Sequence, residues 1–184
     1  MAIGLKSPSL SAGNAKITVR EIILFGFFSA VLIVVQVAKA LIAPYLPNIE
    51  LVSLFIIVYT LVLGKKVFFP IYVFVIVEGL IFGFGLWWLS YLYIWDVLAI
   101  AVLLLRKNGQ PAVWAIVSGV FGLLFGALTS IPYLFVGGIG AAVSYWVNGI
   151  IFDLLHCGGN IIAAALLFRP SYKIMKRLYL HEKI

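Results

Sequence analysis

The residues best suited to chemistry lie near the C-terminal end of the chain, where Asp153, His156 and Asn160 follow one another at steps of three and four residues. This spacing places them on one face of a helix, together with Trp146 and Gly149. A carboxylate beside an imidazole supplies an acceptor and a donor that can hold a polar heteroaromatic ring. The stripe therefore predicts a binding face for a small ring-shaped ligand.

Two other interpretations of the stripe stay open. An Asp–His pair inside a membrane can simply fix the packing of helices, and the same pair could belong to an intramembrane enzyme. We favour the pocket, because ionisable groups inside a bilayer are costly and usually functional. An enzyme would need a nucleophile or a metal set beside the pair, and a metal would need more ligands than one His without clustered thiols. We therefore expect no catalytic residue, no metal and no cofactor.

A second stripe is aromatic. Trp88, Tyr91 and Trp95 stand at i, i+3 and i+7, and Asp96 occupies a neighbouring face. Aromatic faces stack on flat ligands, while indole and phenol groups supply directional hydrogen bonds. The alternative is an interfacial aromatic belt, and it applies most strongly to Trp88.

Other polar residues extend the candidate pocket. One is Glu50, which precedes both stripes along the chain. The others are Tyr145 and Asn148, at the start of the stripe that runs from Trp146 to Asn160. Lys39 has no obvious counter-ion, and we expect Glu78 to pair with it, while the role of Glu50 is left open. Such pairing is what a charged group within a bilayer requires.

The elements that must position these residues are membrane helices. The chain of 184 residues is 65% hydrophobic and only 10% charged, with a mean hydropathy of +1.20. A soluble domain cannot hide so much apolar surface, whereas helices facing lipid need not hide it. The net charge of +7 would suggest nucleic acid in a soluble protein, but here the basic residues flank apolar runs, so topology and anionic lipid explain them.

We predict an all-α fold, one domain over 1–184 made of six transmembrane helices. All 13 Lys and Arg residues except Lys39 fall into alternate gaps between the apolar runs. This positive-inside pattern places both termini in the cytoplasm of a multi-pass protein of the cell membrane. A segment at 1–18 and a basic tail at 170–184 are cytoplasmic, and the tail, with Tyr172 and Met175, is expected to lie in the interface as an amphipathic turn or two. The six predicted spans are about 20–43, 49–64, 67–83, 87–105, 112–135 and 142–168.

This topology separates the two halves of the membrane. The candidate pocket residues gather in the outer half, and the inner half holds almost nothing ionisable, which argues against a continuous proton path. Small residues mark two other faces. Gly26 and Ala30 suit contact with a partner membrane protein in the inner half, whereas Gly122 and Gly126 are expected to pack within the bundle.

Several stretches resemble the substrate-binding S-components of energy-coupling factor (ECF) vitamin transporters. They are most like the subgroup associated with hydroxymethylpyrimidine or pyridoxine uptake, and the likeness covers about residues 18–172. The stretches are PNIELVS at 47–53, YTLVLGKK at 59–66, residues 78–88 with their glycines and two Trp, and FDLLHCGGN at 152–160.

The resemblance implies partners and a division of labour. S-components bind a vitamin from outside with the first loop and spans four to six. They associate with a transmembrane coupling subunit and two cytoplasmic ATPases. The family's A-x-x-x-A contact motif for the coupling subunit would correspond to Gly26-x-x-x-Ala30, which departs from it at the first position. The chain has no phosphate-binding loop, so it would not supply energy from ATP itself. The alternative function is an autonomous ion-coupled small-solute carrier or channel.

The acidic pocket also bears on the substrate. Glu50, Asp96 and Asp153 outnumber the basic Lys39 and His156, so an anion such as pantothenate or folate would meet an unfavourable field. A small neutral or cationic ring with hydroxymethyl groups fits better, and pyridoxine and hydroxymethylpyrimidine both qualify.

Overall fold

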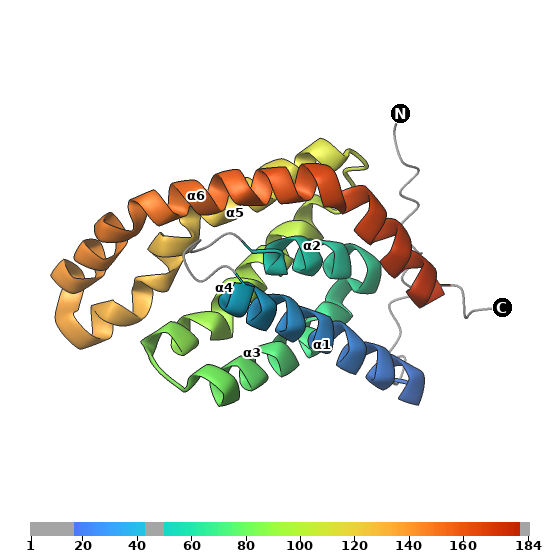
Figure 1. The fold of residues 1–184 in the computed structure, drawn as a ribbon, viewed down its shortest axis with the longest axis horizontal. Helices are drawn as coiled ribbons and strands as arrows, with labels where there is room; N and C mark the ends of the chain where they lie inside the picture. Colours follow the sequence, from blue (N-terminus) through green and yellow to red (C-terminus); the bar gives the residue numbers. More distant parts are fainter. Residues whose placement is uncertain (1–16, 43–49, 181–184) are drawn as a thin grey trace.

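The computed structural model describes residues 17–42 and 50–180, and every regular element within them is a helix (Figure 1). The predicted all-α fold is confirmed for this part of the chain. The elements are α1 (Val19–Ile42), α2 (Val52–Leu63), the 3-10 turn η1 (Gly64–Val67), α3 (Phe68–Phe82), α4 (Leu86–Leu105), α5 (Pro111–Thr129) and α6 (Ile131–Leu180).

Within these described residues, five helical stretches are long and apolar enough to cross a membrane, which is compatible with a multi-pass membrane protein. One of these stretches, Val52–Phe82, contains both α2 and α3. Six separate crossings therefore stay a prediction. The other four stretches are Val19–Ile42, Leu86–Leu105, Pro111–Thr129 and Ile131–Tyr179.

Helix α2 is the central element of the bundle. With 12 residues it reaches about 18 Å at 1.5 Å per residue, well short of a bilayer core of about 30 Å. It packs against α1, α4, α5 and α6, and most of its side chains are buried. Its length and all-round burial are those of an interior helix, which brings the residues near its start into the middle of the molecule.

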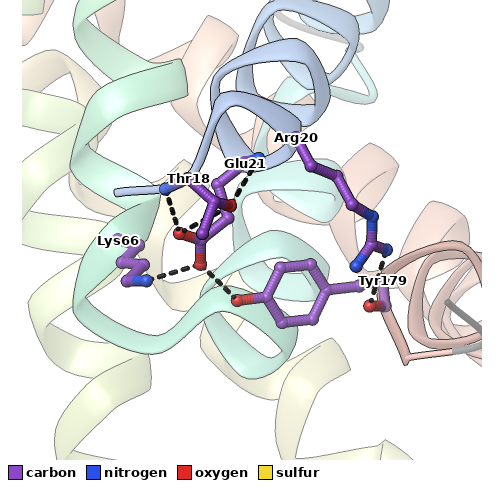
Figure 2. A network of polar contacts seen from close by, with 5 residues as sticks. All are labelled: Thr18, Arg20, Glu21, Lys66 and Tyr179. Carbon is purple, nitrogen blue, oxygen red and sulfur yellow. Dashed lines mark hydrogen bonds and ion pairs between the residues drawn. The ribbon is translucent and has the colours of Figure 1, made fainter. Parts of the chain in front are cut away.

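The start of α1, η1 and the end of α6 meet at one end of the bundle (Figure 2). The Glu21 carboxylate accepts hydrogen bonds from Lys66 Nζ and, at 3.3 Å, from the Tyr179 hydroxyl. Arg20 donates to the Tyr179 carbonyl at 3.4 Å, and the Thr18 backbone N–H bonds Glu21 at 3.1 Å. Three of the basic regions that the charge pattern assigns to one side are therefore together in space.

The C-terminal part of α6 corrects the sequence prediction. The sixth helix does not end before Pro170 but continues through it to Leu180. Tyr172 and Met175 are buried in the core, while the position of this segment in the membrane interface stays a prediction. The Tyr172 ring stacks on Phe168, with centroids 5.7 Å apart, and Phe168 stacks on Trp114. This aromatic packing holds the helix against the bundle beyond Pro170, which removes one backbone donor and crowds the carbonyl of Leu166, four residues earlier.

The fifth helix also differs from the prediction, because α5 ends at Thr129 rather than near 135. Pro132 has no N–H for the carbonyl of Leu128, four residues earlier. The hydroxyl of Tyr93 in α4 donates to that carbonyl at 2.6 Å, and Ser90 donates to the Thr129 carbonyl at 3.2 Å. Helix α4 thus satisfies the backbone groups released at the break.

A second break follows within α6. Gly137 and Gly138 have non-helical backbone angles, and Gly138 has a positive φ of 71° that favours glycine. The chain turns here, as the hairpin between α5 and α6 shows in Figure 1. From this turn α6 runs back along α5 and carries the stripe of polar residues.

Candidate functional site

The site is built on a close contact between α5 and α6. A Cβ at Gly122 would lie 2.9 Å from the backbone of both His156 and Cys157, and one at Gly126 would overlap the Asp153 carboxylate. Glycine is therefore required for the two backbones to approach so closely. The prediction that Gly122 and Gly126 pack within the bundle is confirmed.

The polar stripe of α6 faces the interior. Asp153, His156 and Asn160 are all buried, whereas Trp146 is 41% exposed, so the N-terminal end of the stripe lies outside the site. The backbone N–H of Gly126 donates to Asp153 Oδ1 at 2.8 Å. Asn160 Nδ2 donates to the Ser118 carbonyl at 3.0 Å. Helix α5 thus orients both side chains.

His156 has a different partner from the one its spacing suggests. Its Nε2 lies 3.5 Å from Glu50 Oε1, just before the start of α2, and both side chains are almost fully buried. Ser53 Oγ approaches the same carboxylate oxygen at 3.5 Å. The three-residue step places Asp153 and His156 on one face, but each is held by another element, Asp153 by α5 and His156 by Glu50.

Several polar atoms at this point make no hydrogen bond within the described part of the chain. They include both ring nitrogens of His156, Oδ2 of Asp153 and Nε1 of Trp95. Buried polar groups in native proteins are nearly always hydrogen-bonded, and exceptions need an explanation. A bound polar molecule would provide one.

Aromatic side chains surround Trp95, which is fully buried in α4. Phe125 links it to His156, since the Phe125 ring centroid lies 6.0 Å from Trp95 and 4.9 Å from the imidazole. The Tyr91 and Trp95 rings meet edge to face at 5.2 Å. We call this set the aromatic cage: Phe74, Tyr91, Trp95, Phe121 and Phe125.

Glu78 belongs to the same region and does not pair with Lys39, contrary to the prediction. Among the described residues, no ion pair joins Lys39 to Glu78 or Glu50. Instead, Glu78 is 1% exposed and lies within electrostatic range of Glu50, and Tyr91 interacts with both. Two carboxyl groups thus lie beside the cage.

A cavity of about 400 Å³ opens between α5 and α6 next to the cage. Asp153 and Asn148 supply polar groups to its wall, and Phe125 belongs to both the cavity and the cage. Small vitamins fit within such a volume. The remaining lining residues are Gly126, Thr129, Tyr145, Gly149 and Phe152.

Two predicted site residues lie elsewhere. Trp88 donates its indole N–H to the Val75 carbonyl at 2.9 Å, and Asp96 accepts a hydrogen bond from Tyr72 at 2.5 Å. Both contacts join α3 to α4. The structure therefore brings together Glu50, Tyr91, Trp95, Asp153 and His156, with Tyr145 and Asn148 at the adjoining cavity and Asn160 deeper along α6.

Sequence reasoning missed Glu78, Phe121 and Phe125. The two Phe stand at i, i+4 beside the glycine row of α5, and this pattern is a signal for an aromatic face next to a close helix contact. Glu78 carries no comparable signal, because its proximity to Glu50 depends on how α3 packs.

Gly26 and Ala30 lie on an exposed face of α1, and a Cβ at Gly26 would meet nothing within 4 Å. This face is open to a lipid or protein neighbour. The first loop, expected to contribute to ligand binding, lies outside the described residues.

The described residues contain no group of three His, Cys, Asp or Glu arranged to hold a metal ion. Comparisons with protein-family models, curated proteins and solved structures found no match to this chain.

Proposed function

We propose that the chain is the substrate-binding S-component of an ATP-driven ECF-type vitamin transporter. In this proposal, six spans cross the cell membrane with both termini in the cytoplasm. The ligand is a small heteroaromatic vitamin or precursor, with pyridoxine or hydroxymethylpyrimidine favoured. The observation that carries the proposal is the buried Glu50–His156 contact, 3.5 Å long, beside the aromatic cage.

The chemistry of the site suits such a ring. Trp95 and Tyr91 offer aromatic faces and edges, while His156 and Asp153 retain atoms that no described residue satisfies. Stacking supplies affinity and the few polar groups fix the orientation of the ligand. A site of this kind binds and orients, and it needs neither a nucleophile nor a metal.

The energy for uptake would come from other subunits. The proposed partners are a transmembrane coupling subunit and two cytoplasmic ATPases, with Gly26 and Ala30 on the contact face of α1. The exposure of that face leaves it available to another helix. The sequence contains no phosphate-binding loop, which supports an energy source on other subunits.

A thermal-shift screen of the purified chain against B-vitamins and their precursors, without nucleotide, tests the proposal. One small compound should raise the unfolding temperature. The shift should disappear in His156→Ala, Asp153→Ala and Trp95→Ala and persist in Cys157→Ala, a neighbouring substitution on the same helix. Unchanged shifts in all three site variants would refute the assignment of the site.

Reconstitution separates the proposal from an autonomous carrier. Liposomes containing the chain alone should bind the vitamin without accumulating it under an ion gradient. Accumulation by the chain alone would instead establish an ion-coupled carrier.

A further inference from the structure

The charges buried around the aromatic cage do not balance. Glu50, Glu78 and Asp153 supply three buried carboxyl groups. Among the described residues, the basic side chain that approaches one of them is His156, whose Nε2 lies 3.5 Å from Glu50 Oε1. Among the described residues, no Lys or Arg makes an ion pair with any of the three. The imidazole can offset at most one negative charge.

The unbalanced carboxyl groups are well removed from water. Glu78 is 1% exposed, and Asp153 is also buried. In the described part of the chain, neither Glu78 Oε1 nor Asp153 Oδ2 has a hydrogen-bond partner. A buried charge is costly unless it is paired, and an orphaned acceptor adds its own desolvation penalty. Either a proton or a bound cation can relieve this cost.

The surroundings favour a cation. The faces of Trp, Tyr and Phe rings attract positive charge, and the attraction grows when the charge is desolvated. Trp95 is fully buried among the rings of Phe74, Tyr91, Phe121 and Phe125. Carboxylates beside an aromatic cage are a complementary environment for a flat organic cation.

We infer that the site recognises its ligand in a positively charged form, a small heteroaromatic cation whose charge is balanced by Glu78 and Glu50. The inference rests on the proposed function and names its substrate class. Of the two favoured rings, hydroxymethylpyrimidine fits better. A 4-aminopyrimidine protonated on N3, the ring nitrogen beside the amino group, presents two parallel N–H groups to one carboxylate, the paired geometry that strengthens charge-assisted hydrogen bonds.

Two matched ligand series test the charge preference. Each series keeps one ring and varies one substituent among aminomethyl, hydroxymethyl and carboxylate. The pyridine series is pyridoxamine, pyridoxine and 4-pyridoxic acid. The other series carries the same three substituents at position 5 of 4-amino-2-methylpyrimidine. Affinities are measured at pH 7 by calorimetry on the purified full chain.

In at least one series the amine should bind more tightly than the alcohol, and the carboxylate at least about tenfold more weakly than the amine. Glu78→Gln, which keeps the shape of the side chain, should shrink the ratio of amine to alcohol affinity severalfold. Glu50→Gln is the second variant should Glu78→Gln fail to fold. Glu21→Gln, at the opposite end of the bundle, should leave the ratio unchanged.

Carboxylates that bind as well as the amines would overturn the inference, as would an unchanged ratio in both Gln variants. If an anionic heteroaromatic vitamin such as nicotinate is the compound that binds in a broader screen, the proposed function stands and the cation inference fails. If no compound binds, both fail.

Discussion

Replacing Gly122 by Ala tests the close approach of α5 and α6 on which the site depends. The added Cβ would lie 2.9 Å from the His156 carbonyl carbon and from the Cys157 nitrogen, and 3.0 Å from the His156 carbonyl oxygen. These are backbone atoms, so no side chain can rotate away and the two helices must separate. Overpacking of this kind costs about 1–3 kcal/mol of folding free energy.

Gly158→Ala is the matched control on the facing helix. A Cβ at Gly158 meets nothing within 4 Å, so this variant should be neutral or up to about 1 kcal/mol more stable, because alanine restricts the unfolded chain. The free energy of unfolding is measured for both variants in mixed detergent micelles. Since the separation also displaces His156, Gly122→Ala should weaken vitamin binding. A Gly122→Ala protein as stable as the wild type would refute the helix contact.

Two further predictions concern polar contacts between the helices of the bundle. Tyr93→Phe removes the hydroxyl that donates to the Leu128 carbonyl at the end of α5. This variant should lose about 1–3 kcal/mol of stability in the same unfolding assay. An unchanged stability would mean that another group satisfies this carbonyl. The ion pair between Glu21 and Lys66 is partly exposed, with side chains 15% and 31% accessible, so a double-mutant cycle should give a coupling energy of about 0.5–1 kcal/mol. That coupling should fall as salt is raised from 0.05 to about 0.5 M, and a salt-independent value would contradict the surface character of the pair.

Much of the fold follows from the sequence because membrane helices carry strong local signals. The apolar runs predicted the positions of α1, α3 and α4 to within one or two residues. The step of three and four residues from Asp153 to Asn160 predicted a shared face, and all three polar residues of that face are buried.

Prolines were the main source of error in the helix boundaries. Pro132 and Pro170 look alike in the sequence, yet a helix ends just before the first and continues through the second. The difference depends on distant partners. Tyr93 satisfies a carbonyl at the first break, and Phe168 and Tyr172 stack across the second.

The partners of the acidic residues also could not be read from spacing along one helix. Asp96 meets Tyr72 and Glu78 approaches Glu50, and both arrangements depend on how α3 packs against its neighbours. Likewise, His156 contacts Glu50 across more than a hundred residues of chain rather than Asp153 one turn away. A local pattern identifies a face, but the packing of the bundle decides what the face meets.

Equilibrium dialysis of labelled hydroxymethylpyrimidine and pyridoxine against the purified chain, without nucleotide or other subunits, tests the central claim most directly. We expect saturable binding of one of the two compounds at one site per chain. His156→Ala should weaken it at least about tenfold, because it removes the buried imidazole next to Glu50, and Cys157→Ala should not. Absence of saturable binding, or equal affinity in the wild type and His156→Ala, would contradict the account.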